Sequence, residues 1–133
     1  MIYLDSNVFI YASLHGGREG EWCRALLRRV EEGKEEAVTA ALTIDEVVYQ
    51  VREERGLEPS LEVGRALLQM GHLSIAPTDA NVLWRSLDLS HRFHLFPRDA
   101  IHAATAGVRD VGAFYSEDAD LDAVDGLTRR WMR

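Results

Sequence analysis

Short apolar runs alternate with longer segments of helical periodicity along this chain, and that alternation limits the available folds more than any other feature. The apolar runs lie at 1–5, 37–40, 72–77 and 111–115, and residues with helical hydrophobic spacing fill the intervals between them. Strands that alternate with helices build a parallel sheet covered by helices on both faces. We therefore predict an α/β fold, a three-layer α/β/α sandwich with a mostly parallel central sheet.

The predicted helices are bounded by residues that commonly begin or end helices. Thr43 and Glu46 have the spacing of a capping box, in which the threonine caps the helix and the glutamate reaches back. Helices are predicted over 6–14, 21–32, 43–55, 58–70, 78–89 and 99–106, and a last edge strand within 127–132. The 133 residues are 47% hydrophobic, which is enough for one domain, 1–133, with a core of its own.

The composition favours a location in the cytoplasm but does not indicate a binding partner. Cys23 is the only cysteine, so no internal disulfide can form, which suits a reducing cytoplasm. No apolar run approaches the roughly 20 residues that a membrane span requires. The net charge of −7 at first argues against a nucleic-acid partner, because phosphate binding needs a basic surface. If several carboxylates belong to a metal site, that argument fails, and charge neither supports nor excludes RNA.

Four acidic residues occupy comparable places in the predicted fold. Asp5 and Asp118 each follow a predicted strand, and Glu46 and Asp99 each lie in the first turn of a predicted helix. The carboxyl ends of parallel strands and the N-termini of the helices that follow them lie at one edge of the sheet. Carboxylates gathered there need a counter-charge, and Mg²⁺ or Mn²⁺ prefers such oxygen ligands. The implied reaction is phosphodiester hydrolysis by metal-activated water.

Each acid also has a simpler explanation when it is taken alone. Asp5 and Asp99 suit helix N-caps or first turns, where the helix dipole favours a negative charge. Glu46 suits the capping box, and Asp118 stands in an acidic loop with Glu117 and Asp120. These explanations treat the residues separately. They do not account for four acids at one predicted edge.

The stretches around the four acids carry a resemblance to a known family. Asp5 opens the stretch Asp-Ser-Asn-Val-Phe-Ile-Tyr after an apolar strand, and Glu46 follows Thr43 at a helix start. Asp99 opens the small-residue stretch Asp-Ala-Ile-His-Ala-Ala-Thr-Ala, and Asp118 ends a Ser-x-Asp turn. In this order and spacing the chain resembles the PIN-domain ribonucleases and, among them, the VapC-like toxins of toxin–antitoxin pairs.

The resemblance implies an activity, a set of partners and a set of roles. It implies a homodimeric, Mg²⁺- or Mn²⁺-dependent endoribonuclease that cleaves RNA and is blocked by an antitoxin encoded nearby. The metal ligands would be Asp5, Glu46, Asp99 and Asp118, with Asp120 as a further candidate because Leu121 stands where many members have phenylalanine. Ser6, Asn7 and Ser116 would orient the carboxylates or a metal-bound water.

Two other classes of protein that begin with a strand and an aspartate fit this sequence less well. A haloacid-dehalogenase-type phosphatase needs a second aspartate where Asn7 stands, and a receiver-type phosphoacceptor needs a lysine near the end of the sheet, whereas Lys34 is the only lysine. The remaining alternative is a non-catalytic or housekeeping PIN-like module that binds or processes RNA. The complete set of four acids favours the nuclease.

The basic and aromatic residues yield weaker predictions. Arg98 and His102 are candidates for substrate binding, although solvent exposure of Arg98 and packing of His102 are the simpler expectations. Trp22, Trp84 and Trp131 are expected in the core or at an interface, not as platforms on which RNA bases stack.

Overall fold

A five-stranded parallel sheet forms the centre of the computed structural model, which describes residues 1–132. Arg133, the last residue of the predicted domain, lies outside the described residues. The strands are β1 (Ile2–Leu4), β2 (Ala37–Ala40), β3 (Leu73–Ala76), β4 (Ala113–Tyr115) and β5 (Arg129–Arg130), in the order β3-β2-β1-β4-β5. Every pair of neighbouring strands is parallel, so all the carboxyl ends lie at one edge.

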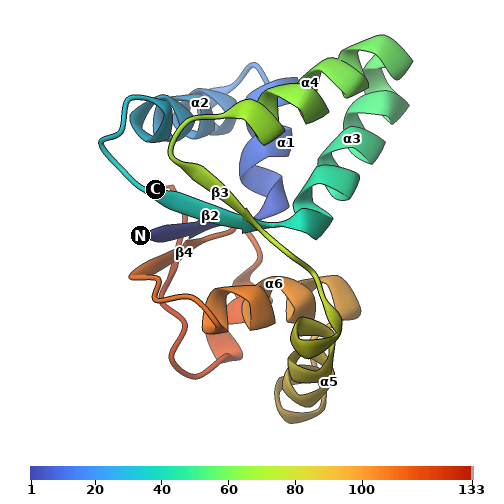
Figure 1. Ribbon diagram of the computed structural model, residues 1–133. Helices are drawn as coiled ribbons and strands as arrows, with labels where there is room; N and C mark the ends of the chain where they lie inside the picture. The colour runs from blue at the N-terminus through green and yellow to red at the C-terminus, as the bar shows by residue number, and fades with distance from the viewer. Residues whose placement is uncertain (133) are drawn as a thin grey trace.

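Helices cover both faces of the sheet and complete the predicted three-layer α/β/α sandwich (Figure 1). One layer contains α1 (Ser6–Leu14), α2 (Arg18–Glu31), α3 (Ala41–Arg55) and α4 (Leu57–Gln69). The opposite layer contains α5 (Ala80–Phe93) and α6 (Pro97–Gly107), and a short 3₁₀ helix, η1 (Ala119–Ala123), joins β4 to the last strand. The fold class is confirmed. Within residues 1–132, no helix combines the length and apolar character needed to cross a membrane.

Successive strand residues point into two separate cores. Ile2 and Leu4 of β1 pack into the core beneath α1 to α4, whereas Tyr3 packs into the core beneath α6. Phe114 of β4 stacks on Tyr3 with ring centroids 4.7 Å apart in that second core. A parallel sheet buried on both faces uses apolar residues on both sides, which is why its strands are continuous apolar runs.

The predicted capping box is wrong. Helix α3 begins at Ala41, directly after β2, and its N-cap, Ala40, makes no side-chain cap. Thr43 is therefore already inside the helix, where its hydroxyl pairs with the hydroxyl of Thr39 at 2.6 Å. Glu46 lies in the second turn and not, as predicted, in the first. The strand-to-helix connection is tighter than the sequence pattern indicates, and this displaces both side chains from the helix end.

The start of α2 also differs from the prediction. The helix begins at Arg18, three residues before the predicted start at Glu21, and it includes Gly20. A Cβ atom at Gly20 would lie 1.8 Å from the carbonyl oxygen of His15, so only glycine permits this approach of the chain to itself. Gly20 thus allows α2 to pack against the end of α1 and is not part of the loop that the glycines of this segment suggest.

Candidate functional site

The four predicted acids converge on the carboxyl edge of the sheet. Asp5 follows β1 and Asp118 follows β4, and these two strands are neighbours with Leu4 paired to Tyr115. Asp99 lies in the first turn of α6, and Glu46 reaches the same edge from α3. Residues that are far apart in the sequence are therefore brought together by the parallel topology.

The buried side chain of His102 contacts two of the acids, Asp5 and Glu46. Its Nε2 lies 2.6 Å from Glu46 Oε1 and 3.3 Å from Asp5 Oδ1, and the residue is only 1% exposed. A carboxylate can only accept a hydrogen bond, so Nε2 carries a hydrogen and donates it to Glu46. Burial acts to lower the pKa of His102, but the adjacent Asp5 and Glu46 carboxylates outweigh it and raise the pKa.

Tyr3 holds the other side of the His102 ring. Its hydroxyl lies 2.7 Å from His102 Nδ1, and it can donate to a neutral ring or accept from a charged one. Burial, together with the charge of Asp5, raises the pKa of Tyr3 well above its usual value, so the hydroxyl stays protonated. In the sequence, Tyr3 is only part of an apolar strand, and His102 is a candidate for substrate contact for which packing is the simpler expectation. The structure places His102 inside the protein as a partner of the acids.

Asp5 is held by donors on both of its oxygens. Oδ1 accepts from the backbone N–H of Ser6 at 2.7 Å, and Oδ2 accepts from the hydroxyl of Ser116 at 2.6 Å. The amide of Asn7 donates to that same hydroxyl oxygen at 3.3 Å, and the N–H of Asp118 donates to it at 3.1 Å. Asp5 is 3% exposed, so its orientation is determined by these partners. Ser6, Asn7 and Ser116 all lie beside Asp5.

Asp99 and Asp118 form a second pair of acids at this edge. Burial, followed by the hydrogen-bonded Asp118 carboxyl and the charge of Asp5, raises the pKa of Asp99 to about 7. Asp120 is exposed, and its backbone N–H donates to Asp118 Oδ1 at 2.9 Å. Asp118 is therefore in side-chain contact with the cluster, whereas Asp120 contacts it through the main chain.

Arg98 and the threonines of β2 and α3 complete the surroundings. Arg98 is exposed, and its Nε lies 4.0 Å from Glu46 Oε2, at the open margin of the site. Thr39 donates from its hydroxyl to the carbonyl of Leu4 at 2.6 Å, which anchors the residue before Asp5. Sequence reasoning missed this interaction because a threonine within a strand has no distinguishing pattern.

The donor chemistry of the edge fits a divalent cation. All four acids supply hard oxygen ligands, and burial, together with the neighbouring Asp118 and Asp5 carboxyls, raises the pKa of Asp99. The side chains are not arranged around a single point: among residues 1–132 no three His, Cys, Asp or Glu side chains form a group that could hold an ion. The N–H of His102 faces the carboxylates of Asp5 and Glu46. A bound cation would attract both of these carboxylates.

Comparison with protein families decides the classification. The PIN-domain family model matches residues 2–127, which is nearly the whole chain. The chain belongs to the PIN-domain family. No curated protein matches it by sequence.

Solved structures with the same fold cover this PIN domain almost completely. The toxin VapC20 of Mycobacterium tuberculosis, described as cleaving the sarcin-ricin loop, is 14% identical with a TM-score of 0.77, over 96% of this chain and 97% of its own. VapBC2 of Rickettsia felis, bound to promoter DNA, is 16% identical with a TM-score of 0.76, over 99% and 100%. FitAcB of Neisseria gonorrhoeae is 21% identical with a TM-score of 0.72, over 97% and 96%. At these identities the likeness establishes the fold.

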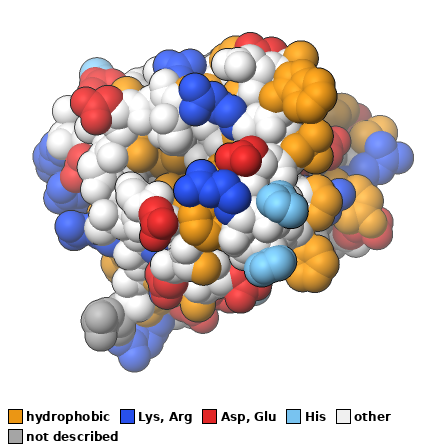
Figure 2. Space-filling model, turned by 90° about the horizontal axis from the view of Figure 1, so that it is seen from below, with side chains coloured by type: hydrophobic (Ala, Val, Ile, Leu, Met, Phe, Trp, Pro, Cys, Tyr) orange, Lys and Arg blue, Asp and Glu red, His pale blue; other side chains and the backbone are white. Residues whose placement is uncertain are grey.

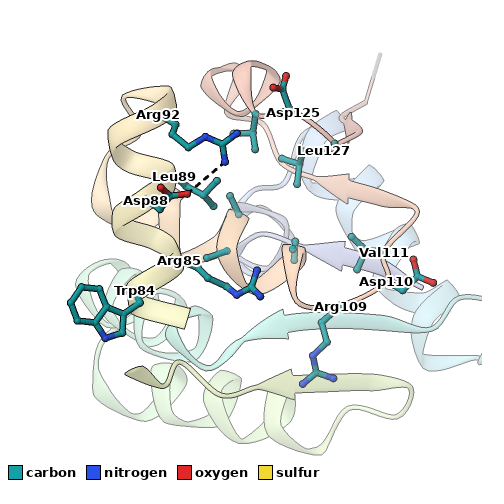
Figure 3. A pocket seen from close by; sticks show the side chains of 16 residues that line it. Trp84, Arg85, Asp88, Leu89, Arg92, Arg109, Asp110, Val111, Asp125 and Leu127 are labelled. Carbon is teal, nitrogen blue, oxygen red and sulfur yellow. Dashed lines mark ion pairs between the residues drawn. The ribbon is translucent and has the colours of Figure 1, made fainter. Parts of the chain in front are cut away.

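The PIN domain also has a cavity that contains none of the four acids. It has a volume of about 560 Å³ and lies between α5, the second half of α6 and the segment before β5 (Figure 3). Arg85, Arg92 and Arg109 line it together with Asp88, Asp110 and Asp125. Figure 2 looks onto the face that α5 and α6 cover, where arginine and acidic side chains are interspersed with hydrophobic ones. We refer to this feature as the arginine cavity.

Proposed function

We propose that this PIN-domain protein is a Mg²⁺- or Mn²⁺-dependent endoribonuclease and the toxin of a toxin–antitoxin pair. The observation that carries the proposal is the convergence of Asp5, Glu46, Asp99 and Asp118 on one edge of the sheet, with Asp5 already oriented by two donors. In this proposal residues 1–133 form a single PIN-like domain that acts in the cytoplasm. The family match over 2–127 and the toxins that share the fold support it.

The four acids would hold the metal ion or ions, with Asp120 as an outer candidate. When bound, a divalent ion would supply Lewis acidity, which activates water and neutralises charge that develops on the phosphate. The raised pKa of Asp99 favours this assignment, because a cation would offset the burial and the nearby Asp118 charge that together keep a proton on this carboxyl.

The other residues of the site act by orienting these carboxylates. Ser116, which Asn7 supports, holds one oxygen of Asp5, and the N–H of Ser6 holds the other. His102 donates to Glu46, and Tyr3 keeps the His102 ring in place. Fixed carboxylates lose less freedom when an ion or a substrate phosphate arrives. Arg98, exposed beside Glu46, is placed to contact a phosphate of the RNA.

Two exposed apolar surfaces support the proposed protein partners. Tyr49, Leu57, Leu61 and Leu68 are exposed on α3 and α4, and Leu83, Trp84 and Leu87 are exposed on α5. Contiguous exposed apolar residues mark interaction sites on soluble domains. Two separate surfaces allow a homodimer and a bound antitoxin to coexist, and several proteins with this fold are described as toxin–antitoxin complexes.

RNA cleavage by the purified protein tests the proposal. We expect cleavage in Mg²⁺ or Mn²⁺, none in excess EDTA, and a loss of about 100-fold or more in Asp5→Asn and in Asp99→Asn, because each removes a charged ligand. Asp110→Asn is the matched control, since Asp110 is an exposed aspartate in the arginine cavity. It should retain full activity, and circular dichroism should show that all three variants are folded.

One outcome would contradict the metal-dependent mechanism, and another would contradict the nuclease activity itself. Full cleavage in EDTA, or by folded Asp5→Asn, would remove the acids from the mechanism. RNA binding by the wild type without cleavage in either metal would favour the alternative of a non-catalytic RNA-binding module.

A further inference from the structure

Next to the acidic edge, the surface contains two connected hollows that the acids do not use. The first has a volume of about 760 Å³ and is lined by Trp22, Tyr115, Trp131, Arg129 and Arg130, with Glu117 and Met132. The second, of about 640 Å³, shares Trp22 and Met132 with the first and extends along α2 past Arg18, Arg24 and Arg28. We refer to the two together as the Trp–Arg groove.

The groove lies beside the acidic site, since Glu117, which lines it, is the chain neighbour of Asp118. Because β4 and β5 are parallel, with Tyr115 paired to Arg130, both strands end at the same edge as β1. Arg129 donates to the carbonyl of Ser116 at 2.9 Å, and the hydroxyl of Ser116 donates to Asp5. Ser116 thus contacts both Arg129, which lines the groove, and Asp5 of the acidic site.

Aromatic rings form one wall of the groove. The rings of Trp22 and Trp131 meet edge to face with centroids 5.2 Å apart, and Trp22 lies 5.9 Å from Tyr115. Trp22 and Trp131 pack partly against the core, as the sequence predicted, but both retain exposed surface in the groove. Aromatic side chains that remain open beside a cationic groove are typical of single-stranded nucleic acid binding, because every base can stack on them.

Arginines supply the positive charge. Arg18, Arg28 and Arg130 are exposed, and within residues 1–132 none of them lies in an ion pair. Arg129, in contrast, is neutralised by Asp122, which accepts from its Nε at 2.8 Å and from its terminal nitrogen at 3.1 Å. Glu21 and Glu117 also line the groove, so the arginines outside ion pairs define a narrow track and not a broad basic surface.

We propose that the Trp–Arg groove binds the single-stranded segment of the RNA substrate adjacent to the scissile phosphate. One or two bases stack on Trp131 and Trp22, and the phosphates that follow contact Arg130, Arg28 and Arg18. This inference rests on the proposed ribonuclease function and adds the path of the RNA. It also explains how a protein with a net charge of −7 binds a polyanion, since the local charge of the groove differs from that of the whole chain.

Binding without cleavage tests the path. Fluorescence anisotropy of a fluorescein-labelled oligouridylate, measured with EDTA present, reports affinity when no metal-dependent cleavage can occur. We expect Arg130→Ala combined with Arg28→Ala to weaken binding about fivefold or more. The slope of the logarithm of the binding constant against the logarithm of the salt concentration should become shallower by about 0.7 for each phosphate that an arginine no longer neutralises. Trp131→Leu, which keeps an apolar side chain against the core, should weaken binding by roughly 5- to 100-fold, because a base can no longer stack there.

Arg85→Ala is the matched control, because Arg85 is an exposed arginine in the arginine cavity on the opposite layer. It should bind as the wild type does. If Trp131→Leu does not fold, the double arginine variant still tests the groove, since both arginines are exposed.

The outcomes separate this inference from the proposed function. Wild-type affinity in the double arginine variant overturns the groove as an RNA path, even if the wild type cleaves RNA. Metal-dependent cleavage by a wild type that does not bind the oligouridylate also overturns it, and would indicate a protein segment in the groove. A wild type that neither binds nor cleaves RNA overturns the proposed function itself.

Discussion

The acidic edge and the arginine cavity both contain several charged residues, but only the acidic edge holds them in place. At the acidic edge, Tyr3, His102, Glu46, Asp5 and Ser116 form a continuous series of contacts of 3.3 Å or less. In the arginine cavity, the one ion pair among its described residues joins Asp88 to Arg92 at 3.6 Å, and both side chains are more than half exposed. Figure 3 shows Asp88 and Arg92 extending from α5, with a dashed line that marks their ion pair.

Contacts that hold the side chains in place therefore distinguish a reactive site better than the volume of a hollow does. Exposed ion pairs contribute little because water screens them and their long side chains remain mobile. A carboxylate such as Asp5, which is buried and accepts from fixed donors, keeps one geometry. At the same edge, burial and the neighbouring Asp118 carboxyl raise the pKa of Asp99. Variants that loosen the acidic edge should therefore have large effects, whereas variants in the cavity should have small ones.

Among the residues that support the acids, removing the His102 donor should produce the largest change in metal binding. His102→Leu leaves Glu46 and Asp5 without their shared partner, so we expect Mn²⁺ affinity to fall by roughly 10- to 100-fold, as is typical when a residue that supports metal ligands is removed. Isothermal titration calorimetry measures this without RNA.

His102→Gln is the control, because its side-chain amide can still donate a hydrogen bond and should restore part of the affinity. Circular dichroism checks that both variants are folded. Mn²⁺ affinity in His102→Leu equal to or above that of the wild type would mean that His102 competes with the ion and does not prepare its ligands.

Asp99 should make the metal-free protein less stable as the pH rises. Its pKa is raised from 3.8 to about 7 in the folded protein, so between these values the folded state binds more protons than the unfolded state. Stability that depends on this proton is present below about pH 4 and is lost as the pH rises through about 7. Asp99→Asn removes this dependence.

Urea unfolding with EDTA at about pH 5 and about pH 8 measures the effect. At the higher pH we expect Asp99→Asn to be more stable than the wild type by about 1 kcal/mol, less than the full shift implies because the side chain is partly exposed. In excess Mn²⁺ the order should reverse, because only the wild type gains stability from a fully charged site. Equal pH dependence in both proteins would show that Asp99 is not crowded.

The sequence predicted the acids and the neighbours of Asp5 (Ser6, Asn7 and Ser116) better than the contact between Tyr3 and His102. Asp5, Asp99 and Asp118 lie at the predicted edge because strand ends and helix starts follow from local patterns and parallel topology. Glu46 reaches it from a different position in its helix, since the tight turn after Ala40 cannot be seen in the pattern. The hydrogen bond between Tyr3 and His102 joins residues 99 positions apart, and neither residue type indicates it.

The contact between the aromatic rings of the Trp–Arg groove also could not be predicted from the sequence. Trp22 lies on an apolar helix face and Trp131 in a short terminal segment, so each is predicted as a packing residue. They meet only because β5 pairs with β4 in parallel and delivers Trp131 to the same edge. Contacts of this kind depend on the register of an edge strand two residues long, which no local pattern specifies.

Substitutions in the arginine cavity should have the smallest effects on cleavage and stability. They strictly test the difference between this cavity and the acidic edge. Arg85→Ala and Arg92→Ala should each change RNA cleavage by less than about twofold and the free energy of unfolding by less than about 0.5 kcal/mol, because both side chains are exposed. Cleavage rates and urea unfolding at one salt concentration measure both quantities. A larger loss of cleavage in either variant, with stability unchanged, would mean that RNA also contacts α5. RNA binding would then extend beyond the Trp–Arg groove to the arginine cavity, and residues outside the acidic edge and the groove would also contribute to cleavage.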